Sequence, residues 1–203
     1  MVDSAVDAEP AVNSLEARQA QLQAEADALR RRWRLDELLS RTGPVHYTGS
    51  YVSGLMVWRD LDVMVLVPSG FGPPDLLGLL TELVALPGVT GFDVHDERGG
   101  RSPTGQRRDE RWHVPLVTDS APGAWRIDLT LWLHDAHANL TRWHEELRAR
   151  LSSEQRAAIL AIKSVWHLRP EYPDQVSGSE IYTAVLEDGV RSPEQFGTWL
   201  ARV

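Results

Sequence analysis

The spacing of apolar residues divides the chain into a helical beginning, a strand-rich middle and a helical end. Apolar residues recur at helical spacing from Ser14 to Arg41, and Thr42-Gly43-Pro44 ends this segment. Ser14 is the expected N-cap of the helix. Residues 1–13 show no such pattern and are predicted to be a loose tail.

The middle of the chain alternates short apolar runs with turn residues, which is typical of a β-sheet. The predicted strands span residues 45–47, 61–67, 89–97, 113–117 and 125–133, with helical stretches at 49–58 and 74–86 and a polar, glycine-rich loop at 98–110. Four more helices are predicted at 141–151, 153–168, 177–189 and 192–202. The pattern therefore predicts an α+β fold: a small mixed sheet with an N-terminal helix and a C-terminal helical module.

Length and periodicity together predict the domain organisation. A chain of 203 residues can build one compact domain, or one domain with a small helical appendage. We expect a core with its N-terminal helix at residues 14–140 and a C-terminal helical module at residues 141–203.

Composition narrows the class of protein. The formal charge of −8 gives no general attraction to nucleic-acid phosphates, although a local basic groove is compatible with it. The absence of cysteine excludes disulfides, thiolate zinc sites and a cysteine nucleophile. No secretory signal and no apolar run of about 20 residues is present, so a cytoplasmic protein without a membrane span is expected.

The segment around residue 50 carries the clearest chemistry. Asp60 and Asp62 open a predicted strand, and their spacing places both carboxylates on one face, roughly 7 Å apart along the chain. Magnesium prefers such oxygen ligands, usually one or two carboxylates together with phosphate oxygens and water. Gly49 lets a phosphate approach the backbone, and Ser50 and the following N–H groups can bind it.

A third carboxylate lies in the predicted strand at residues 125–133. Asp128 interrupts an apolar run, and a buried aspartate is costly unless it is paired or binds a metal. If this strand lies beside the strand that carries Asp60 and Asp62, the three carboxylates converge. Two metal ions about 3.5–4 Å apart could then activate an acceptor hydroxyl and stabilise a leaving pyrophosphate.

The Gly-Ser pair, the Asp-x-Asp pair about ten residues later and the distant third aspartate resemble the DNA polymerase beta-like nucleotidyltransferase superfamily. The resemblance is carried by Gly49, Ser50, Asp60, Asp62 and Asp128, and it covers roughly residues 43–135. It implies that the three aspartates hold two Mg²⁺ ions, with Mn²⁺ as a substitute, and that the Gly-Ser pair holds the triphosphate. The alternative is a surface hairpin with helix-capping aspartates.

The C-terminal helices resemble those of poly(A) polymerases, CCA-adding enzymes and oligoadenylate synthetases, in which a lysine-bearing helix precedes a serine-containing turn. By this resemblance Lys163 and Ser179 would contact the triphosphate and Tyr182 would lie near the nucleoside. The alternative for Lys163 is a solvent-facing position on its helix.

Several other features are weaker candidates. His134, His137 and His144 lack the spacing of a zinc site, so capping and surface positions are favoured for them. Most tryptophans are expected to pack in cores, with a stacking role open for Trp58 and Trp132. The arginine-rich loop at 99–111 could bind acceptor or phosphate, or be a disordered surface loop.

The sequence thus predicts a metal-dependent enzyme that transfers a nucleotide from a nucleoside triphosphate to an acceptor hydroxyl. Asp128 would complete the acceptor-side ion and help to deprotonate the hydroxyl. A small, acidic chain favours a small-molecule acceptor over RNA or protein, whereas the lysine-helix resemblance favours RNA tailing or oligonucleotide synthesis. A non-catalytic nucleotide-binding module is the second class of function, and pairing of two copies through the N-terminal helix is open.

Overall fold

The computed structural model describes residues 8–119, 123–135, 139–173 and 175–202, and it has the α+β class that the sequence predicts. The chain forms two compact units. The sheet unit comprises Ala24–Ser53 and Arg59–Arg148. The helical unit comprises the described residues up to Gln23, Gly54–Trp58 and the described residues from Ala149 onward.

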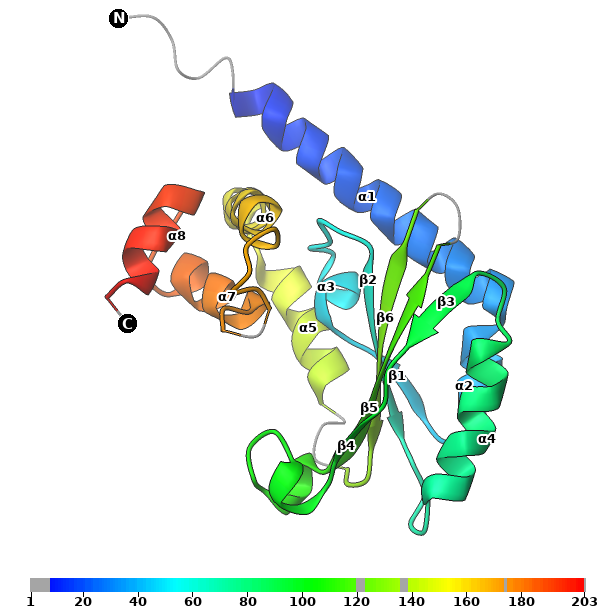
Figure 1. Cartoon of the computed structure of the whole chain (residues 1–203). Helices are drawn as coiled ribbons and strands as arrows, with labels where there is room; N and C mark the ends of the chain where they lie inside the picture. The colour runs from blue at the N-terminus through cyan, green and yellow to red at the C-terminus, as the bar shows by residue number, and fades with distance from the viewer. Residues whose placement is uncertain (1–7, 120–122, 136–138, 174, 203) are drawn as a thin grey trace, which may run out of the picture. The chain divides into compact units, whose positions relative to one another are not determined.

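The sheet unit is built on a mixed sheet with the strand order β1-β2-β6-β5-β3, to which β4 adds by pairing with β5 (Figure 1). Among the strand pairs of the described residues, β2–β6 is parallel and the others are antiparallel. The strands are β1 (Val45–Tyr47), β2 (Asp60–Leu66), β3 (Val89–Phe92), β4 (His95–Glu97), β5 (Arg111–Thr118) and β6 (Trp125–Trp132). The predicted strand at 89–97 is thus two short strands, and both pair with β5.

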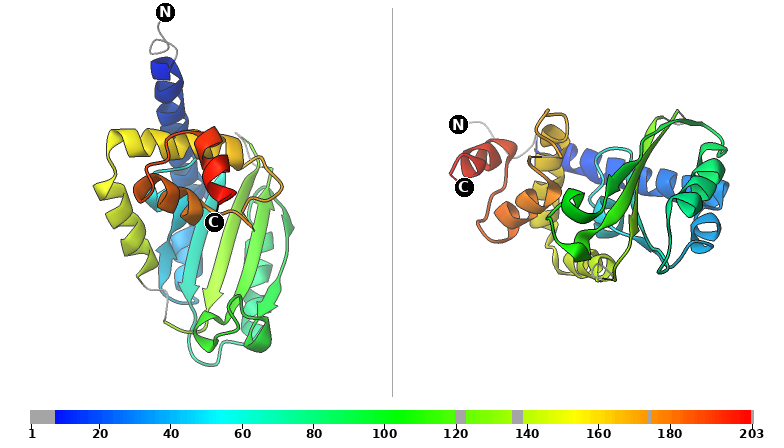
Figure 2. Two further views of the ribbon diagram at one scale, coloured as in Figure 1. Left: turned by 90° about the vertical axis from the view of Figure 1, so that its left-hand side faces the viewer. Right: turned by 60° about the horizontal axis from the view of Figure 1, so that its bottom comes forward.

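Side chains alternate along the strands, so the two faces of the sheet differ in polarity. One face is apolar and packs under α2 (Leu35–Ser40), α4 (Pro73–Val84) and the last turns of α1 (Ala8–Trp33), as Figures 1 and 2 show. The apolar stripe of α4 repeats at helical spacing. The buried residues of this layer include Leu61, Val63, Val65, Leu76, Leu79, Leu80, Leu83, Val114, Leu116, Ile127, Leu129 and Leu131. The opposite face carries α3 (Gly49–Ser53) and the polar side chains of β2, β5 and β6.

The helical unit packs α6 (Ser153–Trp166), α7 (Gly178–Leu186) and α8 (Pro193–Leu200) around an apolar core. Ser152 and Ser177 cap α6 and α7 in reciprocal capping boxes with Gln155 and Glu180, so both helices begin where local sequence favours it. Phe196 is fully buried and meets Trp166 edge-on at 4.9 Å between ring centroids. Most of α5 (Leu140–Arg150) belongs to the sheet unit.

The largest differences from the predicted element boundaries lie in the first helix and after Gly49. The first helix begins at Ala8, so residues 8–13 are helical rather than part of a tail and Ser14 is not its N-cap. Pro10 is tolerated because a first-turn N–H has no partner within a helix. The same helix breaks at Arg34, whose φ of 50° is left-handed, and α2 continues separately. The helix predicted at 49–58 ends at Ser53.

Among the described residues, no helix combines the length and the apolar composition that crossing a bilayer would require.

Candidate functional site

The parallel pairing of β2 with β6 brings the three candidate aspartates onto one face of the sheet. Asp62 lies opposite Asp128 in the register, and Asp60 lies opposite Arg126. Neighbouring strands are about 4.8 Å apart, so the backbones of Asp62 and Asp128 are adjacent. The side chains of all three aspartates are half-buried on the polar face. The condition set by the sequence, that the two strands are neighbours, is therefore met.

Gly49 packs directly against the carboxylate of Asp62. The residue has a φ of +62°, and a Cβ built on it would overlap Asp62 Oδ2 and lie 2.8 Å from Asp62 Cγ. The backbone N–H of Thr48 also donates to the carbonyl oxygen of Asp62 at 3.2 Å. Only glycine satisfies both the left-handed backbone and this close approach. Ser50, the next residue of α3, is buried.

A cluster of polar and aromatic side chains anchors α3 to α1 within the sheet unit. The Tyr51 hydroxyl donates to Asp27 and accepts a hydrogen bond from Arg30, whose guanidinium lies 3.8 Å from the centre of the Tyr47 ring. Burial and the hydrogen bond to Asp27 raise the pKa of Tyr51, so its hydroxyl keeps its proton at neutral pH. This cluster fixes the start of the Gly49-Ser50 turn, and sequence reasoning did not identify it.

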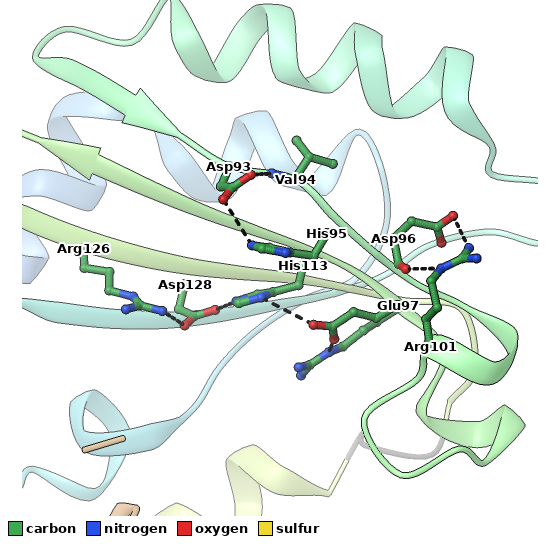
Figure 3. Close-up of polar contacts among 10 residues, drawn as sticks. Asp93, Val94, His95, Asp96, Glu97, Arg101, His113, Arg126 and Asp128 are labelled. Carbon is green, nitrogen blue, oxygen red and sulfur yellow. Dashed lines mark hydrogen bonds and ion pairs between the residues drawn. The ribbon is translucent and has the colours of Figure 1, made fainter. Parts of the chain in front are cut away.

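The carboxylate of Asp128 accepts hydrogen bonds at both oxygens (Figure 3). His113 on β5 bonds Oδ1, and Arg126 donates to Oδ2 at 3.3 Å. Burial alone would raise the pKa of Asp128, but the hydrogen bond and charge of His113 and the positive charges of Arg126 and Arg111 outweigh it. The pKa of Asp128 is therefore lowered, and the group is ionised at neutral pH.

The carboxylate oxygens of the aspartates fit a divalent cation whose remaining ligands come from a substrate. Within the ranges that the structure describes, no three His, Asp or Glu side chains lie close enough together to hold a metal ion by themselves. The aspartates thus share a face without forming a closed cage. Magnesium does not need such a cage, because it usually takes one or two carboxylates and completes its shell with phosphate oxygens and water. Asp60 and Asp62, with Gly49 leaving room beside them, fit that pattern.

The remaining predicted site residues belong to the helical unit. Lys163 is only 2% exposed, and its Nζ donates to the carbonyl oxygen of Leu55 at 2.9 Å. Tyr182 is buried with its ring centre 6.0 Å from that nitrogen, and the Ser179 hydroxyl bonds the Ser177 hydroxyl at 2.6 Å. The solvent-facing alternative for Lys163 is therefore wrong. A role in holding triphosphate stays a prediction for Lys163, Ser179 and Tyr182.

Lys163 is the only lysine of a chain that otherwise uses arginine for its basic side chains. We expect Lys163→Met to leave the Leu55 carbonyl without its buried donor and to lower the free energy of unfolding by about 1–3 kcal/mol. Lys163→Arg should not restore the lost stability, because a planar guanidinium is bulkier than an ammonium. Urea unfolding followed by tryptophan fluorescence measures both changes. Wild-type stability in Lys163→Met would contradict this anchoring role.

The arginine-rich loop after β4 is more ordered than the sequence predicts. It contains two short 3₁₀ turns, Gly99–Arg101 and Arg107–Asp109. Arg98 and Arg101 both pair with Asp96, at 2.7 Å and 2.5 Å. These pairs lie on the surface of the sheet unit, next to a hollow of about 670 Å³ that the loop shares with residues 68–70 and His134. Contact of this loop with acceptor or phosphate stays a prediction.

The other weaker candidates have structural partners. His134 bonds Glu110 at 2.9 Å, and His144 packs edge-on against Trp143 on α5, while His137 lies outside the described residues. Trp58 contacts the rings of His167 and Tyr172 in the helical unit. Trp132 is buried on β6, with the Arg111 guanidinium 5.2 Å from its ring centre.

Comparisons with known proteins support the fold. No family model matches the sequence, and no curated protein sequence matches it. Two solved structures containing GLD-2, the GLD-2–GLD-3 poly(A) polymerase complex and the GLD-2/RNP-8 complex, match with TM-scores of 0.50. Their sequence identities are 12% and 13%, and the matches cover 93% and 94% of this chain.

The chain is shorter than these proteins. It spans 64% and 68% of the two GLD-2 chains, and 39% of Cid1, an RNA terminal uridylyl transferase that matches with 20% identity and a TM-score of 0.42. The GLD-2 matches show that the chain shares the fold of these two structures, in agreement with the fold that the resemblance of the Gly-Ser and aspartate motifs implies.

Proposed function

We propose that this protein is a metal-dependent nucleotidyltransferase that moves a nucleoside monophosphate from a nucleoside triphosphate to an acceptor hydroxyl and releases pyrophosphate. The observation that carries the proposal is the register pairing of Asp62 with Asp128, together with the contact of Gly49 with the Asp62 carboxylate. These contacts join the phosphate-binding turn to the metal-binding strand. The alternative, a surface hairpin with helix-capping aspartates, would not require the turn and the strand to be in contact.

Each residue has a stated role in this proposal. Asp60 and Asp62 would hold both cations, and Asp128 would complete the shell of the acceptor-side ion. Gly49 and Ser50 would hold the β- and γ-phosphates beside the Asp62 carboxylate. When bound, the cations would supply Lewis-acid activation of the acceptor hydroxyl and charge stabilisation at the leaving pyrophosphate. The lowered pKa of Asp128 makes its carboxylate a weak base, which favours ligation over proton abstraction as its role.

For the acceptor, the similarity to GLD-2 favours the 3′ hydroxyl of an RNA over a small molecule. The match extends over 93% of the chain, so it includes the C-terminal helices as well as the sheet. Those helices carry Lys163 and Ser179, whose pattern resembles RNA-tailing enzymes. Because the net charge is −8, an RNA would have to bind through a local basic surface rather than the general field of the protein.

The direct test is nucleotide transfer with and without divalent cation. The protein is incubated with each labelled nucleoside triphosphate, Mg²⁺ and a short single-stranded RNA, and both released pyrophosphate and RNA length are measured. We expect RNA extension that EDTA abolishes and that excess Mg²⁺ or Mn²⁺ restores. An RNA with a blocked 3′ hydroxyl should not be extended.

The outcomes separate the competing functions. Pyrophosphate release without RNA extension, with label entering small metabolites of a cell extract, would identify a small-molecule acceptor. Triphosphate binding with no turnover on any acceptor would favour a non-catalytic module. Turnover that is indifferent to EDTA would contradict the metal-dependent mechanism.

A further inference from the structure

A row of polar side chains crosses the sheet from β4 to β6 and ends at the carboxylate of Asp128 (Figure 3). In the register of the sheet, His113 on β5 lies between His95 on β4 and Thr130 on β6. His113 is on the same face as Asp128, on the side of β6 that is remote from β2. The imidazole can therefore reach the Asp128 carboxylate without occupying the space between Asp128 and Asp62.

The imidazole of His113 is held on several sides. Its Nε2 is hydrogen-bonded to Asp128 Oδ1, and its Nδ1 lies 3.9 Å from Glu97 Oε1. Glu97 in turn accepts a hydrogen bond from Arg111. The His113 ring stacks on His95 with 5.5 Å between centroids and an interplanar angle of 27°. Only 16% of the His113 side chain is exposed, so the ring has little freedom to turn.

The bonds to Asp128 leave part of its carboxylate available. An ionised carboxylate has about four lone-pair sites. His113 uses one site on Oδ1 and Arg126 uses one on Oδ2. The two remaining sites can serve a cation. A free Asp128 side chain would be pushed away from Asp62, because two carboxylates on adjacent strands repel each other until a cation lies between them.

We propose that His113 is a positioning residue that fixes the Asp128 carboxylate, so that its remaining oxygen lone pairs can complete the cation site formed with Asp60 and Asp62. This inference rests on the proposed function. Hydrogen-bond partners of metal-ligating carboxylates typically contribute 10- to 100-fold to metal affinity or activity. The pattern of contacts places His113 in that role, with Glu97 and His95 holding its ring.

Two substitutions separate the hydrogen bond from the packing of the ring. His113→Leu removes the hydrogen bond to Asp128 and puts an apolar side chain of moderate size in place of the ring. His113→Gln keeps an N–H donor at a similar reach from the backbone. His134→Gln is the matched control, since His134 also bonds a carboxylate through Nε2, that of Glu110, but beyond the C-terminal end of β6.

The experiment measures cation binding and turnover on the full chain. Mn²⁺ is titrated in the presence of a non-hydrolysable nucleoside triphosphate and followed by electron paramagnetic resonance. We expect His113→Leu to raise the Mn²⁺ dissociation constant 10- to 100-fold. It should lower kcat with little change in the KM for the triphosphate, since it loosens a metal ligand and not the triphosphate contacts. His113→Gln should recover most of both losses, and His134→Gln should match the wild type.

Each outcome decides the inference. Unchanged Mn²⁺ affinity and kcat in His113→Leu would overturn it while leaving the proposed function intact. Equal losses in His113→Leu and His113→Gln, with both variants folded as judged by thermal unfolding, would also overturn it. If the wild type neither binds Mn²⁺ nor releases pyrophosphate, the proposed function fails and this inference fails with it.

Discussion

Replacement of Asp62 by asparagine is expected to abolish nucleotide transfer, with a fall in kcat on the order of 10³-fold or more. Asp62 is the central member of the trio, since it lies opposite Asp128 in the register and against Gly49. The amide keeps the size of the side chain but removes the negative charge that a divalent cation requires. Metal activation contributes several kcal/mol to the transition state, and each 1.36 kcal/mol is a tenfold change in rate. Pyrophosphate release at saturating Mg²⁺ measures the effect.

The stability of the Asp62→Asn variant distinguishes a catalytic from a structural aspartate. Removing one of three neighbouring like charges relieves repulsion, so without added metal we expect thermal stability to be unchanged or raised. A structural role predicts a clear loss instead. Asp75→Asn is the matched control, because Asp75 caps α4 on the apolar side of the same sheet. Full activity in Asp62→Asn would refute the assignment.

Much of the sheet was predictable because its strands carry strong local patterns. The run at 61–67 is almost continuously apolar and rich in valine, and the run at 125–133 alternates with period two. The structure has strands there at Asp60–Leu66 and Trp125–Trp132. The C-terminal helices were predictable for a similar reason, since Ser152 and Ser177 begin capping boxes. Local sequence determines these elements almost alone.

The break after α1 and the surroundings of Asp128 depend on contacts between distant residues. Nothing in the sequence near Arg34 marks a left-handed residue. The break coincides with the burial of Trp33, whose Nε1 donates to the Pro87 carbonyl oxygen across the sheet unit. His113 could be linked to Asp128 only once β5 was known to pair with β6. The alternation of β5 placed His113 on the face opposite Val114, but it did not give the neighbouring strand.

The position of Lys163 shows a second kind of contact that the sequence could not predict. A lysine on an amphipathic helix is usually exposed or bound to an anion, and its charge leads to both of these predictions. The structure instead buries it against the Leu55 carbonyl, a group 108 positions away in the chain. A backbone carbonyl leaves no trace in the residue types of a sequence, so such a partner cannot be inferred from composition or spacing.

Gly49→Ala is expected to lower nucleotide transfer on the order of 10²-fold while the protein still folds. The added methyl group would overlap Asp62 Oδ2, so either the carboxylate or the turn must move. A displacement of about 1 Å in a catalytic constellation costs roughly 10²-fold in rate. The left-handed φ of +62° adds a strain of about 1–3 kcal/mol, which thermal unfolding will report.

Gly70→Ala separates the two effects of the Gly49 substitution. Gly70 has a φ of +98°, so alanine there is also strained, but a Cβ at that position meets nothing within 4 Å. We therefore expect Gly70→Ala to lose stability and keep its activity, whereas Gly49→Ala loses both. The difference between the activity losses of Gly49→Ala and Gly70→Ala then measures how much the contact with Asp62 contributes. Equal activities in the two alanine variants would mean that the Gly49–Asp62 junction has no part in the reaction.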